Sequence, residues 1–238
     1  MPKFRTVLFD CDSTLSAIEG IDELAAHCRD EVAALTDAAM RGRIPLEEVY
    51  ARRLRLVQPT RDAVTALGRA YVERLVPDVR ETVEALVSSG VDVRIISGGL
   101  LPAVLAVAEV LGVTRDRVAA VDIRFGADGR YEDFDASSPL AATGGKRVAI
   151  ERWRVARPAM MVGDGTTDLE ARPVVDLFVA FAGVVERPSV VNSADAVIRA
   201  NSMAPVLPLV VDADELPTRS HRSLYDRGVA MSASVTAP

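Results

Sequence analysis

The stretch Val7-Leu8-Phe9-Asp10-Cys11-Asp12-Ser13-Thr14 decides the fold, because an apolar run stops there at two aspartates one residue apart. The run from Thr6 to Phe9 is short, β-branched and aromatic, which predicts a buried strand. Side chains at i and i+2 of an extended segment point to the same side, so Asp10 and Asp12 are expected to face one pocket. Cys11 is expected to point the other way, into the core. In open α/β sheets, ligands bind beyond this edge of the strands.

Two neighbouring carboxylates repel each other, so they need a cation, a shared proton or both. Aspartate is also a nucleophile for phosphoryl groups and forms an aspartyl-phosphate. The pattern is short enough to arise by chance, and the alternative is a strand end with one solvated aspartate and a helix-capping Asp or Ser. The rest of the chain must distinguish these interpretations.

The composition is that of one large globular domain, or of one domain with a smaller insert, with 238 residues and a net charge of −6. The acidic balance argues against a general nucleic-acid binder, which normally has a basic face. The two cysteines, Cys11 and Cys28, are expected to be buried thiols rather than a disulfide. The sequence shows no signal peptide and no apolar run of membrane length, which predicts a soluble, cytoplasmic protein.

A helical insert is expected after the first strand. Between Ser13 and Leu75, apolar residues recur at helical spacing and no strand-like run occurs. We therefore predict a helical cap over residues 16–74, inserted into an α/β core of residues 1–15 and 75–212.

Beyond the cap, strands and helices alternate. Helices are expected at 77–88, 101–111 and 146–153, and strands at 91–96, 159–162, 177–181 and 196–198. This alternation predicts an α/β fold with a doubly wound, mostly parallel, Rossmann-like sheet. The Asp128-Gly129 turn signal predicts a β-hairpin from Val118 to Phe134. Residues 213–238 are polar and irregular, and are expected to form a flexible tail.

Polar residues end three of the predicted strands. They are Asp10 with Asp12, Ser97-Gly98-Gly99, and Asp164. A serine hydroxyl and glycine N–H groups before a helix can bind an anion, although such a stretch is more often only a loop. Lys146 follows two glycines at a helix start and, taken alone, is a surface lysine. Asp164 is a candidate to complete a Mg²⁺ site with Asp10, because Mg²⁺ prefers one or two carboxylates, waters and a phosphate oxygen.

Together these stretches resemble the phosphoserine phosphatases of the haloacid dehalogenase superfamily. DCDST at 10–14 matches the first family motif and ISGG at 96–99 the second. GGK at 144–146 carries the lysine of the third, and VGDGTTDLEA at 162–171 matches the fourth. Four motifs in the right order are a specific signal, and the likeness extends over residues 4–198.

The resemblance implies a Mg²⁺-dependent hydrolysis of O-phospho-L-serine, the last step of serine synthesis, through an aspartyl-phosphate. Asp10 would be the nucleophile, and Asp12 would be the general acid and then the base for water. Mg²⁺ would be held by Asp10, the backbone carbonyl of Asp12 and Asp164. Asp168 would stand beside this site, although its position also suits a simple charge at a helix N-terminus.

The resemblance also implies how the substrate is bound. Glu19 would contact the substrate amino group, and Arg53 would pair with its carboxylate, which the guanidinium fork suits. The phosphate oxygens would be held by a hydroxyl, two backbone amides and a lysine, from Ser97, Gly98, Gly99 and Lys146. Further residues near the substrate or phosphate would be Met40, Thr167 and Arg187.

Two cap residues depart from the family pattern, and both bear on the choice of substrate rather than on the phosphate chemistry. Arg41 stands where a glycine is common, and Leu46 stands where a phenylalanine usually packs over the substrate. One alternative is a related phosphatase or phosphotransferase that acts on another small phosphorylated metabolite. Another is a non-catalytic phospho-aspartate switch, against which the intact Asp12 argues. The expected partner is a small phosphomonoester, with no nucleic acid and no membrane, bound by a monomer or homodimer.

Overall fold

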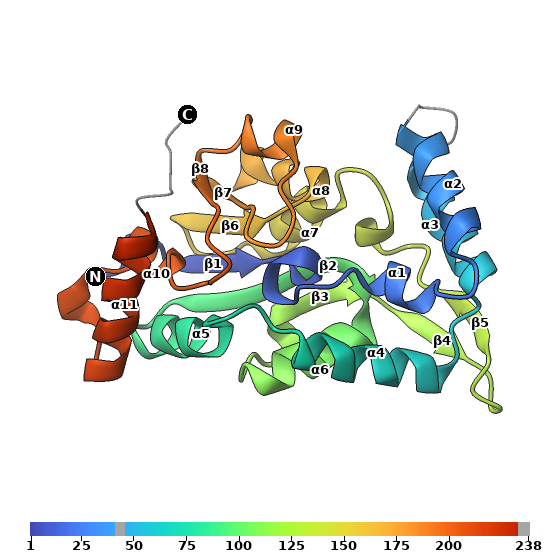
Figure 1. Cartoon of the computed structure of the whole chain (residues 1–238), viewed down its shortest axis with the longest axis horizontal. Helices are drawn as coiled ribbons and strands as arrows, with labels where there is room; N and C mark the ends of the chain where they lie inside the picture. The colour runs from blue at the N-terminus through green and yellow to red at the C-terminus, as the bar shows by residue number, and fades with distance from the viewer. Residues whose placement is uncertain (41–45, 233–238) are drawn as a thin grey trace.

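The main sheet contains six strands. The computed structural model describes the backbone of residues 1–40 and 46–232 and the side chains of residues 1–35 and 48–232. The strands are β1 (Thr6–Phe9), β2 (Asp92–Leu100), β3 (Val118–Val121), β6 (Ala159–Gly163), β7 (Leu177–Phe181) and β8 (Ala196–Ile198). They lie in the order β3-β2-β1-β6-β7-β8, and every neighbouring pair is parallel (Figure 1). The predicted doubly wound α/β fold is therefore confirmed.

β1 lies inside the sheet, between β2 and β6. All four of its side chains are buried, as expected for a parallel strand that is covered on both faces. Asp10, the residue that follows Phe9, therefore lies where an inner strand ends, with a neighbouring strand on each side.

Helices cover both faces of the sheet (Figure 1). α5 (Val79–Ser88) and α6 (Leu101–Val110) lie on one side. α7 (Gly145–Trp153), α8 (Thr166–Leu169) and α9 (Pro188–Val191) lie on the other. No helix within residues 1–40 and 46–232 combines the length and the apolar character needed to cross a bilayer.

The segment between Ser16 and Leu75 is helical in its described part. Its helices are α1 (Gly20–Leu24), α2 (Arg29–Met40), α3 (Leu46–Val57) and α4 (Arg61–Glu73). α4 packs along α6, so this insert is joined closely to the core. The chain leaves and re-enters the core at one place, where Ser16 and Leu75 form an antiparallel bridge. The cap boundaries at residues 16 and 74 stay a prediction.

A two-stranded antiparallel hairpin supports the insert. It consists of β4 (Ile123–Phe125) and β5 (Tyr131–Phe134). The Phe134 ring lies 5.2 Å from the Tyr50 ring of α3. The Gly129 carbonyl oxygen accepts a 2.9 Å hydrogen bond from the N–H group of Arg61, at the start of α4.

The predicted hairpin from Val118 to Phe134 is wrong in its first strand. Val118 and Val121 are buried in β3, which joins the main sheet beside β2. The Asp128-Gly129 signal determines only the two strands next to the turn. β2 also extends beyond its predicted end, through Ser97-Gly98-Gly99 to Leu100, because a bulge restores its pairing with β3.

The predicted flexible tail is also wrong over most of its length, since α11 (Arg219–Met231) is an ordered helix. The Thr218 side chain accepts a hydrogen bond from the N–H group of His221 and caps its N-terminus. Its buried residues, at 221, 224 and 228, have helical spacing and face α5 and α10 (Val206–Val210). The sequence of α11 is mostly polar, so the three buried positions were not recognised as the apolar face of a helix. Residues 233–238 of the predicted tail lie outside the described residues.

We predict that Gly228→Ala destabilises the protein by about 1–3 kcal/mol, because overpacking carries such a penalty. A Cβ atom at 228 would lie 2.4 Å from the carbonyl oxygen of Ala204. Urea unfolding measures the change, with Val229→Ala at the neighbouring exposed position as the control. Equal midpoints for the two variants would show that α11 does not pack as closely as described.

Candidate active site

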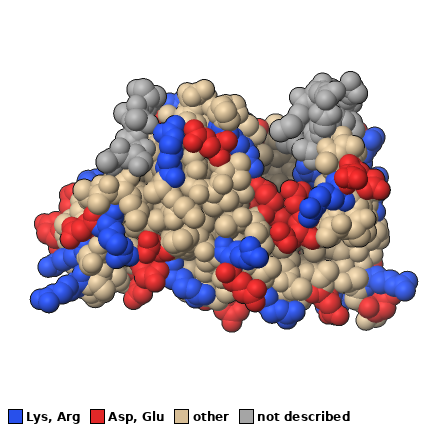
Figure 2. All heavy atoms as spheres, viewed as in Figure 1, with Lys and Arg blue, Asp and Glu red and all other residues tan. Residues whose placement is uncertain are grey.

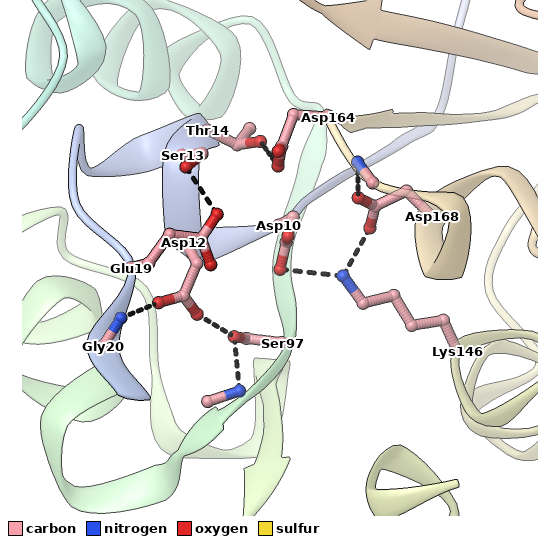
Figure 3. Close-up of polar contacts among 12 residues, drawn as sticks. Asp10, Asp12, Ser13, Thr14, Glu19, Gly20, Ser97, Lys146, Asp164 and Asp168 are labelled. Carbon is pink, nitrogen blue, oxygen red and sulfur yellow. Dashed lines mark hydrogen bonds and ion pairs between the residues drawn. The ribbon is translucent and has the colours of Figure 1, made fainter. Parts of the chain in front are cut away.

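The predicted strand-end residues meet at the carboxyl edge of β1, β2 and β6 (Figure 3). A cavity of about 240 Å³ opens there, and an adjoining hollow of about 500 Å³ shares several of its residues. Residues that line both are Asp10, Asp12, Glu19 and Thr167. The first also contains Arg53, Gly98, Gly99 and Lys146, and the second contains Asp164 and Arg187.

A tight turn after β1 brings the first two aspartates to one cavity. Asp10 is extended, and an irregular turn, η1 (Cys11–Leu15), follows it, in which Asp12 and Ser13 have non-helical backbone angles. Ser13 has a φ of 51°, in the left-handed region, and its hydroxyl donates a 2.7 Å hydrogen bond to Glu19 Oε1. Cys11 is a buried free thiol, as predicted, and so is Cys28.

Asp10, Asp164 and Asp168 form a buried carboxylate cluster, whose ligand oxygens lie within 4.8 Å of one another. The Lys146 Nζ atom lies 2.8 Å from Asp10 Oδ1 and also forms an ion pair with Asp168 Oδ1 (Figure 3). Asp168 Oδ2 accepts a 2.8 Å hydrogen bond from the N–H group of Gly165. Asp168 thus fixes the lysine against Asp10, and it is more than a charge at a helix N-terminus.

Burial dominates the electrostatics of this cluster. Burial, followed by the charge of Asp168, raises the pKa of Asp10 to about 8. Burial alone would lower the pKa of Lys146, but Asp10 and Asp168 outweigh it and raise that pKa above its usual range. The lysine therefore stays charged.

The cluster fits a hard divalent cation. Its three carboxylates are buried, and a single ammonium, that of Lys146, is shared by Asp10 and Asp168. Asp164 accepts a 3.1 Å hydrogen bond from the Thr14 hydroxyl and forms an ion pair with Arg187. Buried carboxylates that outnumber their cations are costly, and oxygen ligands of this kind suit Mg²⁺.

The two oxygens of Asp12 have different surroundings. Oδ1 accepts hydrogen bonds of 2.6 Å from the N–H group of Gly20 and 2.6 Å from the Tyr71 hydroxyl. Oδ2 accepts one longer bond, 3.3 Å, from the hydroxyl of Ser97. Burial raises the pKa of Asp12, and the bonds from Tyr71 and Gly20 oppose that rise.

The other predicted residues are placed as follows. Ser97 is buried and, in addition to its bond to Asp12, accepts a 2.9 Å hydrogen bond from the N–H group of Gly99. Arg187 Nη2 lies 3.0 Å from Glu19 Oε1, so this arginine links Glu19 to Asp164. Burial lowers the pKa of Arg53, which lines the cavity from α3. The side chain of Met40 lies outside the described residues.

Sequence reasoning missed two contributors to the site. Tyr71 is visible in the sequence only as one apolar position of a helix, and 59 residues separate it from the aspartate it contacts. No local pattern reveals such a hydroxyl. Tyr50, on α3, lines the same cavity and has no motif around it either.

Comparisons with known proteins agree with this geometry. The family model described as haloacid dehalogenase-like hydrolase matches residues 4–173. The chloroplastic phosphoserine phosphatase of Arabidopsis thaliana is 40% identical over 201 residues, which are 82% of this chain and 68% of that protein. The human phosphoserine phosphatase is 39% identical over 193 residues, which are 79% and 86% of the two chains.

A solved structure is similar over nearly the whole fold. It is a phospho-aspartyl intermediate analogue of phosphoserine phosphatase, with a TM-score of 0.72 and 27% identity. The match covers 87% of this chain and 99% of that chain. The chain therefore belongs to the haloacid dehalogenase-like hydrolases, and its similarity to the phosphoserine phosphatases identifies it as a phosphoric monoester hydrolase of that family.

Proposed function

We propose that the protein is a Mg²⁺-dependent phosphoserine phosphatase, which converts O-phospho-L-serine and water into L-serine and phosphate. The observation that carries the proposal is the buried pair of Asp10 and Lys146, with Asp12 held in the same cavity. The identity of about 40% to relatives named phosphoserine phosphatases supports the substrate.

Asp10, the backbone carbonyl of Asp12 and Asp164 would hold Mg²⁺, with Asp168 beside them. When bound, the ion neutralises carboxylate charge and orients a phosphate oxygen. Lys146 adds a second positive charge at Asp10, which offsets the repulsion between this carboxylate and a phosphate dianion.

In the first half-reaction, a carboxylate oxygen of Asp10 attacks phosphorus while the bond from phosphorus to the seryl oxygen breaks. Asp12 gives its proton to that oxygen, so serine leaves as an alcohol rather than an alkoxide. In the second half-reaction, Asp12 takes a proton from a water molecule whose oxygen attacks phosphorus. The bond from phosphorus to Asp10 breaks, and both aspartates return to their starting states.

The remaining pocket residues bind the two ends of the substrate. The hydroxyl of Ser97, the amides of Gly98 and Gly99 and the ammonium of Lys146 would hold the phosphate oxygens. Glu19 would bind the amino group, and Arg53 would pair with the carboxylate. Met40, Thr167 and Arg187 would make further contacts with the substrate or its phosphate.

A second candidate is a phosphatase or phosphotransferase for another small phosphorylated metabolite. The apolar wall of the cavity favours it, because apolar side chains do not select for the amino and carboxylate groups of an amino-acid substrate. It contains Ile21, Val49, Leu67, Leu100 and Leu140. A panel of phosphorylated amino acids, sugars and amines, assayed for phosphate release, distinguishes the candidates.

The other partner assignments also stay predictions from the sequence. These are a monomer or homodimer, a cytoplasmic location and no binding of nucleic acid. On the face seen in Figure 2, the described basic and acidic side chains are interspersed.

Asp10→Asn is expected to lower phosphate release more than about 1,000-fold, because the amide is a poor nucleophile. Circular dichroism should show an unchanged fold. Asp62→Asn, at an exposed position of α4, is the matched control and should retain activity. Turnover by the Asp10 variant close to that of the control would contradict the nucleophile assignment.

Arg53→Ala is expected to raise KM for phosphoserine about 10- to 100-fold, because a hydrogen-bonded charge pair is lost. KM for phosphoethanolamine, which lacks the carboxylate, should change little. Arg55→Ala, at an exposed position of the same helix, is the control. Equal effects on both substrates would remove the carboxylate role from Arg53 and favour the second candidate.

Mg²⁺ affinity is expected to increase about tenfold per pH unit below pH 8 and to level off above it. The reason is that the raised pKa of Asp10, about 8, keeps it protonated, and the proton must leave before the metal binds. Isothermal titration calorimetry with Mg²⁺ alone, from pH 6 to pH 9, measures this. Affinity that is independent of pH would show that Asp10 is already ionised without metal.

A further inference from the structure

We propose that Tyr71 is a positioning residue for the acid–base step: it holds Oδ1 of Asp12, so that the proton is given and taken by Oδ2. The inference rests on the proposed function, in which Asp12 protonates the leaving oxygen. It adds which atom of Asp12 acts and which residue selects that atom.

Oδ1 of Asp12 is fully engaged. The Tyr71 hydroxyl and the N–H group of Gly20 each donate a 2.6 Å hydrogen bond to it, which occupies both of its lone pairs. Tyr71 is fully buried, so no water competes for this contact. A Cβ atom at position 20 would lie 2.0 Å from the Tyr71 hydroxyl oxygen, and therefore only glycine lets both donors reach one oxygen.

Oδ2 of Asp12 is the available atom. Its one hydrogen bond in the described structure, from Ser97, is 3.3 Å long. A Cβ atom at Gly99 would lie 3.0 Å from Oδ2, so this oxygen faces the glycine pair that lines the cavity. A carboxylic acid carries its proton on the oxygen with the free lone pair, and here that oxygen faces the space proposed for the phosphate.

Tyr71 is held in a fixed place relative to the turn that carries Asp12. The Ser16 hydroxyl donates a 3.1 Å hydrogen bond to the carbonyl oxygen of Tyr71. The N–H group of Ala17 donates a 2.8 Å hydrogen bond to the carbonyl oxygen of Arg74. The N–H group of Val76 donates a 2.9 Å hydrogen bond to the carbonyl oxygen of Leu15. The end of α4 and the turn after β1 are thus tied together, which gives the hydroxyl a constant position.

Tyr71→Phe removes one oxygen atom and keeps the buried ring. We expect kcat/KM for phosphoserine to fall about 10- to 100-fold, within the contribution of a general acid, mainly through kcat. For p-nitrophenyl phosphate the change should be less than about twofold, because nitrophenolate leaves without a proton. kcat/KM is compared because it depends only on the steps up to phosphoryl transfer to Asp10. The two substrates differ in that step, since only the seryl oxygen needs a proton in order to leave. Tyr225→Phe, on α11 and away from the site, is the matched control and should leave both values unchanged.

Equal losses on the two substrates, or no loss on phosphoserine, would overturn the proposal. The ratio of the two values on one preparation does not depend on the fraction folded, so partial unfolding of the variant cannot imitate the expected result. Failure of the unaltered protein to hydrolyse phosphoserine would instead count against the proposed function. The same comparison would then use phosphoethanolamine, whose leaving oxygen also belongs to an aliphatic alcohol and also needs a proton.

Discussion

The ion pairs that Lys146 forms with Asp10 and Asp168 are the interaction on which the rest of the site depends. A buried ammonium is costly unless it is paired, and so is each buried carboxylate. The lysine comes from α7, Asp10 from the end of β1, and Asp168 from α8. The three elements must therefore meet at one edge of the sheet before any of these charges can be buried. The order of the strands, with β1 between β2 and β6, makes that meeting possible.

Much of this arrangement is predictable from the sequence, because each of its parts is encoded locally. Thr6 to Phe9 specify a buried strand by composition alone, and a strand buried on both faces places Asp10 at an inner edge. Asp164 follows a strand of the same kind. Parallel strands bring such ends together whatever the intervening chain does. The meeting of Asp10 and Asp164 therefore follows from strand positions, whereas Asp168 and Lys146 come from helices and are expected at the site only from the family resemblance.

The elements that sequence reasoning placed wrongly are those that depend on distant partners. β3 is short, and its own sequence does not determine whether it pairs with β2 or with the hairpin. The burial of its side chains in the folded protein decides this pairing. α11 has three buried positions among charged ones, and these gain their meaning only when α5 and α10 are present. The hydroxyl of Tyr71 is the sharpest case, since its partner lies 59 residues away. Hydrogen bonds between distant side chains leave no periodic trace.

The bridge between Ser16 and Leu75 has a consequence for how such a protein can change over time. The two ends of the helical insert lie side by side, so its length can vary with little effect on the closure entropy of the core. Exchange of cap residues that line the cavity, such as Tyr50 and Arg53 of α3, would alter what enters it, while the sheet edge that performs phosphoryl chemistry stays the same. Selectivity and reactivity are in this sense modular, since they are encoded in separable lengths of chain.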